Sequence, residues 1–191
     1  MRICCVLAAL ASASAFASPM WDTDSMWGAP GKDMTLLCAV MEASGGRDNF
    51  NSRHALDMAL GKEKAQQEYD KLSAQFGEGK VYRFFAVNDT LFKEGLMAAN
   101  LHYGAQYEPV GWDASTPRDF IRAGMDNDYY SSERQLDRLF GHTLHEQLMK
   151  SIEWRYGSEA GHEYHMVMDQ LVQDMAPQVG LSNLKISPAT G

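Results

Sequence analysis

The helical spacing of apolar residues constrains the fold of this chain more than any other feature. Between residues 33 and 180, apolar side chains recur about every 3.6 positions. The stretch from Val81 to Leu96 keeps this period, although its β-branched and aromatic residues would also suit a strand. A lone strand would need a partner, and no second stretch is convincing as one. We therefore predict an all-α fold, a single irregular bundle of about six helices.

Caps, glycines and prolines set the expected helix boundaries. The expected helices cover residues 33–44, 52–76, 80–103, 116–125, 132–156 and 162–176. A joint at Gly61 and a break at Asn88-Asp89 are left open, and the helix from residue 132 is expected to be the longest. Residues 126–128 should form a turn and cap that helix. We find no internal repeat, and we expect residues 181–191 to be a loose tail.

The composition is that of an ordinary globular domain. Apolar residues make up 45% of the 191 positions and charged residues 22%, which excludes wholesale disorder. The formal net charge of −8, without a Lys/Arg cluster, argues against nucleic acid and anionic membranes as partners. Beyond the N-terminal apolar run, no stretch approaches the ~20 residues of a membrane span, so none is expected in the mature chain.

Cys38 is the only cysteine outside residues 1–17, so the mature chain cannot form an intramolecular disulfide. It falls with Met34, Leu37 and Met41 on the apolar face of the first expected helix. A buried free cysteine behaves as a small hydrophobe, and nothing in the sequence supplies the base that a nucleophile needs. We expect Cys38 to be a core residue.

Residues 1–17 have the anatomy of an export signal. Arg2 supplies a positive charge, residues 3–10 form a short apolar run, and small residues follow up to Ala17. The run is too short to anchor the chain permanently in a bilayer. If the route is ordinary secretion, Ala15 and Ala17 are the small residues of an A-x-A cleavage site.

A second route follows from residues 14–19, Ser-Ala-Phe-Ala-Ser-Pro. This stretch resembles the Ala-Phe-Ala-Pro cleavage motif in presequences of algae whose complex plastids derive from a red alga. The resemblance implies a cut before Phe16 and a transit peptide that carries the protein into the plastid. Two features depart from the pattern: Ser18 stands where Pro is usual, and the following residues are acidic where transit peptides are basic. The plastid is the favoured destination over the extracellular space or a periplasm.

Residues 18–32 are expected to be a flexible arm, or a transit remnant that is removed. The arm carries two Met-Trp pairs, Met20-Trp21 and Met26-Trp27, outside any expected helix. An exposed indole is unfavourable in water, and Trp is enriched at binding hot spots. Such an arm would dock either on a partner or on its own domain. We take these four residues as the candidate partner-binding residues.

The strongest candidate metal ligands are two His-x-x-His pairs, His142/His145 and His162/His165. If their helices form an antiparallel hairpin about residues 157–161, His145 lies roughly 18 Å from the hairpin end and the second pair within about 6 Å of it. The pairs then do not converge, and neither matches a zinc-protease pattern. We therefore predict no metal site.

No motif identifies a reaction. Nucleophile-elbow, phosphate-loop, dinucleotide and haem-attachment patterns do not occur in the sequence, and residues 126–137 fail the EF-hand spacing. Asn88-Asp89-Thr90 is a glycosylation sequon, but its expected place within a helix disfavours modification. The sequence identifies no catalytic residue and no cofactor.

Three functional hypotheses follow. The first is a non-catalytic accessory or interaction protein that packs on a larger assembly, which in a complex plastid would be a photosynthetic complex. The second is a small soluble enzyme or cofactor-binding protein, with a site around His102, Tyr107 and Trp112 in and beside the loop at residues 104–115. The third is a secreted interaction module. A deep pocket lined by His102, Trp112 or His142 would favour the second hypothesis, and an exposed apolar stripe on a helix would favour the first.

Overall fold

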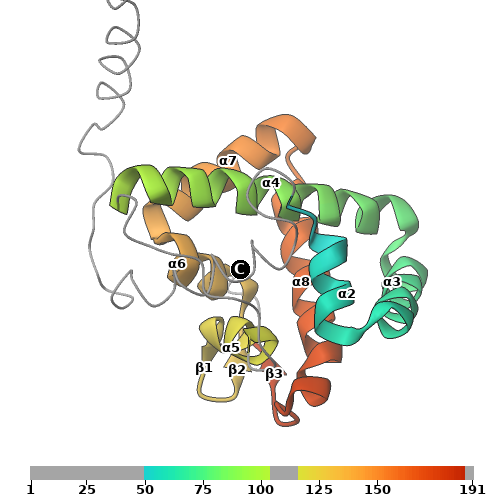
Figure 1. Cartoon of the computed structure of the whole chain (residues 1–191). Coiled ribbons are helices and arrows are strands. Elements are labelled where there is room, and N and C mark those ends of the chain that lie inside the picture. Colours follow the sequence, from blue (N-terminus) through green and yellow to red (C-terminus); the bar gives the residue numbers. More distant parts are fainter. Residues whose placement is uncertain (1–49, 104–115, 188–191) are drawn as a thin grey trace, which may run out of the picture.

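The computed structural model describes residues 50–103 and 116–187, and helices dominate both ranges (Figure 1). The seven α-helices in these ranges are α2 (Ser52–Leu60), α3 (Lys62–Phe76), α4 (Glu78–Tyr103), α5 (Thr116–Ala123), α6 (Ser132–Phe140), α7 (His142–Tyr156) and α8 (Ala160–Met175). A 3-10 helix, η1 (Ala176–Val179), follows α8. The all-α prediction is confirmed. The expected helix at residues 33–44, the arm and the export signal lie outside the described residues.

Glycines separate helices at one place where the sequence leaves a joint open and at one where it predicts no break. Gly61 divides α2 from α3, where the sequence leaves a joint open, and Gly141 divides α6 from α7, where one long helix is predicted. Gly141 has φ 83° and ψ 146°, a conformation that residues with a Cβ rarely adopt. The prediction that the helix from residue 132 is the longest is therefore wrong. Among the described helices α4 is the longest, and it runs unbroken through Asn88 and Asp89.

Three two-residue strands form a small sheet. β1 (Met125–Asp126) and β2 (Tyr129–Tyr130) are antiparallel, and Asn127 in the turn between them has φ 52°. The predicted turn at residues 126–128 is confirmed. The predicted cap is wrong, because the Ser131 hydroxyl caps α6 by accepting from the Arg134 N–H at 3.4 Å.

Residues 181–187 of the C-terminal segment pack on the fold. β3 (Lys185–Ile186) pairs parallel with β2, and the Ser187 N–H donates to the Tyr130 carbonyl at 2.7 Å. The apolar side chains of Leu181, Leu184 and Ile186 pack against the core. The prediction of a loose tail is therefore corrected for residues 181–187, and residues 188–191 lie outside the described ranges.

The chain contains a repeated helical unit with an offset of 80 residues. The first unit comprises residues 50–92 and the second residues 130–172. Each has a nine-residue helix (α2 or α6), a glycine, a fifteen-residue helix (α3 or α7), and a second glycine before a core helix (α4 or α8). The first glycine has φ 81° in one unit and 83° in the other. The expectation of no internal repeat is therefore wrong.

Equivalent hydrogen bonds stabilise the two units. The Ser52 N–H donates to the Asp89 carboxylate at 2.7 Å, and the Ser132 N–H donates to the Asp169 carboxylate at 3.0 Å. Nine positions are identical between residues 52–92 and 132–172, namely Ser52/Ser132, Leu56/Leu136, Asp57/Asp137, Gly61/Gly141, Gln67/Gln147, Gly77/Gly157, Val87/Val167, Asp89/Asp169 and Leu91/Leu171. Because the other positions differ, the repeat is clear in the backbone and faint in the sequence.

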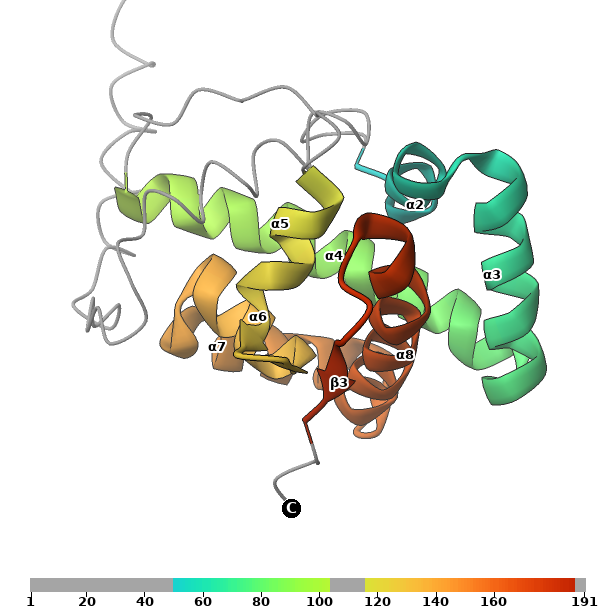
Figure 2. The same ribbon diagram turned by 90° about the horizontal axis from the view of Figure 1, so that it is seen from below.

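The helices α4 and α8 cross at the centre of the fold (Figures 1 and 2). The equivalent residues Phe84 and Tyr164 stack there, with ring centroids 5.4 Å apart. α3 packs against α8, and α7 packs against α4. The fifteen-residue helix of each unit therefore contacts the core helix of the other unit. The predicted apolar stripe of α8 is buried as expected, at Tyr164, Met168, Leu171 and Met175. The two units thus share one hydrophobic core.

Candidate functional site

Most of the predicted site residues lie outside the described ranges. These are Met20, Trp21, Met26 and Trp27 in the arm, and Tyr107 and Trp112 in the loop. Cys38, which is predicted to be a core residue, also lies outside these ranges. His102 belongs to the last turn of α4, but its side chain is not among those described. The roles assigned to these residues stay predictions. Asn88 of the glycosylation sequon lies within α4, as predicted, and its side chain is buried.

An apolar pocket of about 80 Å³ lies between α2, α4, α5 and α8. Its lining is apolar except for Ser52 and Asn88. The Ser52 hydroxyl donates to the Phe85 carbonyl at 3.3 Å, and the Asn88 carbonyl oxygen accepts from the Tyr164 hydroxyl at 2.9 Å. Both polar side chains are therefore already engaged. The pocket offers an apolar surface rather than groups for acid, base or nucleophilic chemistry.

The pocket marks a difference between the two units. Ala55 and Ala59 line it, whereas Gln135 and Leu139 occupy the equivalent positions of the second unit and are buried. Gln135 also donates a hydrogen bond to the Phe120 carbonyl, which joins α6 to α5. Small side chains in the first unit therefore leave a space that larger side chains fill in the second.

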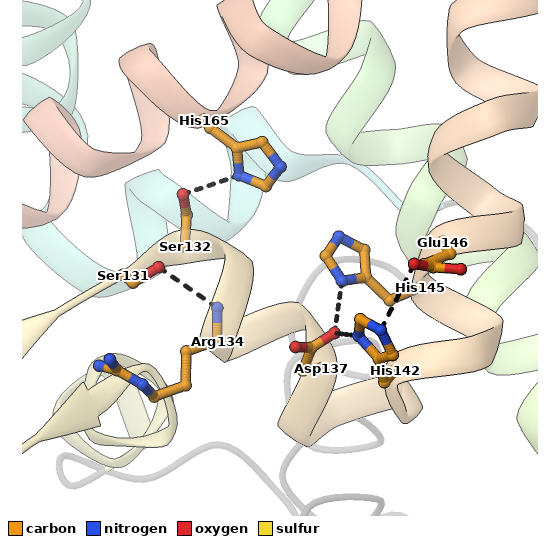
Figure 3. A network of polar contacts seen from close by, with 8 residues as sticks. All are labelled: Ser131, Ser132, Arg134, Asp137, His142, His145, Glu146 and His165. Atoms are coloured by element: carbon orange, nitrogen blue, oxygen red, sulfur yellow. Dashed lines mark hydrogen bonds and ion pairs between the residues drawn. The ribbon is translucent and has the colours of Figure 1, made fainter. Parts of the chain in front are cut away.

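A polar network joins α6, α7 and α8 in the second unit (Figure 3). Asp137 in α6 accepts from His142 Nδ1 at 3.1 Å and from His145 Nδ1 at 2.7 Å. Burial raises the pKa of the Asp137 carboxyl, but the hydrogen bonds and charges of His145 and His142 outweigh it and hold that pKa below its usual value. The same contact raises the pKa of His142. The carboxylate thus ties α6 to α7 across the glycine that separates them.

His145 and His165 lie close together, with ring centroids 6.0 Å apart. The predicted separation of the two histidine pairs is therefore wrong at this point. The predicted separation is based only on the distance of each residue along its helix axis. In the structure, the side chains of both residues extend into the space between α7 and α8 and approach each other there (Figure 3). His162 of the second pair is exposed. Among the described residues, no group of three or more His, Cys, Asp or Glu side chains could hold a metal ion.

His165 is a partly buried side chain that is neutral at physiological pH. Its Nδ1 lies 2.9 Å from the Ser132 hydroxyl. Burial, with the charges of His145 and His162, lowers the pKa of His165 to about 4, against an opposing effect of Asp137. The first unit has Phe85 at the equivalent position, so the fold accepts an apolar ring there.

A carboxyl pair joins α3 to α8. Glu68 is 8% exposed and is hydrogen-bonded to Asp174, which also forms an ion pair with Lys71 at 2.6 Å. Burial, followed by the hydrogen bond and charge of Asp174, raises the pKa of Glu68 to about 7, although Lys71 opposes the shift. In the described structure Glu68 Oε1 is buried without a hydrogen-bond partner. The raised pKa belongs to Glu68, because at Asp174 the effect of burial is outweighed by hydrogen bonds to Lys71, Glu68 and Gln170, which lower the pKa of Asp174.

Trp154 is the largest exposed apolar side chain in the described ranges. It lies near the end of α7 and is 86% exposed. The first unit has Ala74 at the equivalent position, where it is also exposed, so the fold does not require an indole there. The sequence offers one signal for Trp154, because it lies off the apolar stripe of Leu144, Leu148 and Ile152.

Comparisons with known proteins add no relative. No family model, no curated protein and no solved structure matches this chain. Within residues 50–103 and 116–187, none of the helices combines the length and the apolar character that a membrane span requires.

Proposed function

We propose that this protein is a non-catalytic accessory protein that docks on a larger assembly through Trp154. The 86% exposure of this indole is the observation that carries the proposal. Burying an indole can contribute about 2–3 kcal/mol to an interface, and Trp is enriched among the residues that dominate binding energy. Since Ala74 suffices at the equivalent position, an interface explains Trp154 better than the fold does.

The proposed partner is a protein that offers an apolar pocket to the indole. Lys150, Glu153 and Arg155 are exposed on α7 near Trp154, so the surface around the indole carries charges of both signs. A buried apolar centre with a charged rim is the usual anatomy of a protein–protein interface. The net charge of −8 favours a partner with a basic surface. Trp21 and Trp27 of the arm are proposed as further anchors on the same assembly.

Replacing Trp154 by Ala is expected to release the protein from its assembly without unfolding it. The variant gives α7 the residue that α3 has at the equivalent position, so Tm should change by no more than about 2 °C. Loss of about 2–3 kcal/mol of binding corresponds to an affinity at least roughly 30-fold weaker. Co-purification of tagged variants from the native source, followed by mass spectrometry, measures this.

The control for that experiment is Met58→Ala, which removes an exposed apolar side chain from α2 and should co-purify like the wild type. Equal recovery of the partner with Trp154→Ala would contradict the docking role. The double variant Trp21→Ala with Trp27→Ala tests the arm in the same assay. Loss of the partner at unchanged Tm supports the arm as an anchor, whereas a Tm lower by several degrees would mean that it packs on its own domain.

We propose the plastid of a red-lineage alga as the compartment, which would make the assembly photosynthetic. The proposal rests on the likeness of residues 14–19 to the plastid cleavage motif. A fluorescent reporter fused to residues 1–32 is expected to enter the plastid, and Phe16→Ala is expected to hold it in the secretory route. A reporter that leaves the cell with the unaltered presequence would remove the plastid and the photosynthetic assembly together, and would favour a secreted interaction module.

The alternative of a small enzyme or cofactor-binding protein stays a hypothesis. Its site residues His102, Tyr107 and Trp112 have no described side chains. The apolar pocket is lined by α2, α4, α5 and α8, and His142 is not part of its lining. No specific observation therefore favours this alternative over docking.

A further inference from the structure

The second unit is preceded by a helix that the first unit lacks in the described ranges. This helix, α5, has eight residues and packs against α6. Gln135 of α6 donates to the Phe120 carbonyl, and Arg138 of α6 donates to the Ala123 carbonyl at 3.1 Å. α5 is thus bound to the short helix of its own unit, and the question is what covers the equivalent face of α2.

The repeat extends in the sequence beyond the described part of the first unit. Eighty residues before α5 lie residues 36–43, where Leu37, Val40 and Met41 correspond to Pro117, Phe120 and Ile121. Ala43 at the end of this segment corresponds to Ala123, and the flanking residues also correspond, with Asp33/Asp113, Asp48/Asp128 and Phe50/Tyr130. Residues 33–44 are also a predicted helix on their own apolar spacing. The sequence therefore predicts a counterpart of α5 ahead of the first unit.

The apolar pocket lies where this counterpart would pack. It lies between α2 and α5, and Phe50, the first described residue, is part of its lining. Phe50 stacks on Phe92 of α4, with ring centroids 5.2 Å apart, so the chain enters the described fold at the pocket itself. The 49 preceding residues include the predicted helix. The volume of about 80 Å³ suits one or two aliphatic side chains better than a large ligand.

We infer that residues 36–43 form the counterpart of α5 and that Leu37 and Met41 fill the apolar pocket of the first unit. The occupant of the pocket is then this chain itself. Ala55 and Ala59 are small because side chains of this segment occupy the space that Gln135 and Leu139 fill in the second unit. The inference also requires that any presequence cleavage occurs before residue 33. It does not rest on the docking role of Trp154.

A matched pair of aspartates tests the segment in the full chain. Met41→Asp places a charge at the counterpart of Ile121, which is buried, and is expected to lower Tm by roughly 5–15 °C. Ala39→Asp places the same charge at the counterpart of Asp119, which is exposed, and should leave Tm within about 2 °C. If Met41→Asp does not fold, Met41→Ala replaces it in the test and is expected to lower Tm by a smaller amount. An unchanged Tm for both variants at position 41 would overturn the inference.

A pocket-filling variant tests the occupant by the sign of its effect. Ala59→Phe should lower Tm when the segment already fills the pocket, because an extra ring overpacks it. In the Met41→Asp background the same change should leave Tm unchanged or raise it, because the pocket is then vacated. A higher Tm for Ala59→Phe in the otherwise unaltered chain would mean an empty pocket. That result would overturn the inference and leave the pocket open to the side chain of a partner.

Discussion

Replacing Glu68 by Gln is expected to stabilise the protein by up to about 3 kcal/mol above pH 7. Burial and Asp174 raise the pKa of Glu68 from 4.5 to about 7, so the folded state binds its proton more tightly than the unfolded state does. The stability that this proton confers is fully present below pH 4.5 and is lost as the pH rises to about 7. Glutamine keeps the neutral form at every pH, and its amide can donate to Asp174.

Urea unfolding of Glu68→Gln at pH 8 and at pH 4 measures this effect. The gain should be large at pH 8 and close to zero at pH 4, because the carboxyl is then protonated in both states. The control is Glu63→Gln in the exposed first turn of α3, which should change stability by less than about 1 kcal/mol at either pH. A gain that is the same at both pH values, or a loss at pH 8, would contradict the buried carboxyl pair.

Replacing His165 by Phe is expected to protect the protein from mild acid. Burial lowers the pKa of His165 from 6.5 to about 4, so the unfolded state binds the proton more tightly. Because of this residue, the free energy of unfolding of the wild type should fall by up to about 3 kcal/mol as the pH falls from 6.5 to 4. Phenylalanine removes the loss and is the residue of the first unit, where the Ser52 hydroxyl donates to the Phe85 carbonyl instead.

Unfolding of His165→Phe at pH 7 and at pH 4.5 measures the protection, with His54→Gln, at an exposed histidine of α2, as its control. In the wild type the two pKa shifts have opposite effects as the pH falls. Protonation of Glu68 raises the free energy of unfolding over much of the pH range in which protonation of His165 lowers it. The wild type should therefore depend weakly on pH, and Glu68→Gln should be more sensitive to acid. Equal acid sensitivity in His165→Phe and the wild type would rule out His165 as the cause.

The helices could be predicted because the sequence signals that mark them, apolar spacing and caps, are local. The apolar residues of α4 and α8 are at helical spacing, and both segments are helices. In α4 this spacing outweighs the strand preference of the β-branched and aromatic residues near Val81. The break at Gly141 could not be predicted, because a glycine is compatible with either outcome. Gly95 stays within α4, where a side chain would meet the Phe140 ring, whereas Gly141 adopts φ 83° and ends a helix. Tertiary packing decides between the two.

The candidate sites depend on contacts between distant residues, and this limits what the sequence predicts of them. His145 and His165 meet only because α7 and α8 pack together, and no local pattern indicates that contact. The significance of Ala59 follows only from its comparison with Leu139, which requires the repeat to be known. Trp154 is different, since its position off the apolar stripe is visible in the sequence.

The size of the native particle tests the central claim, that this protein is a subunit of a larger assembly. A mild extract of the native source, separated by size and probed with an antibody against the folded domain, measures it directly. We expect the wild-type protein to elute with a complex far larger than a monomer of this chain, and Trp154→Ala to shift it to the monomer position. Elution of the wild type as a free monomer across low and physiological ionic strength would contradict a role as a subunit.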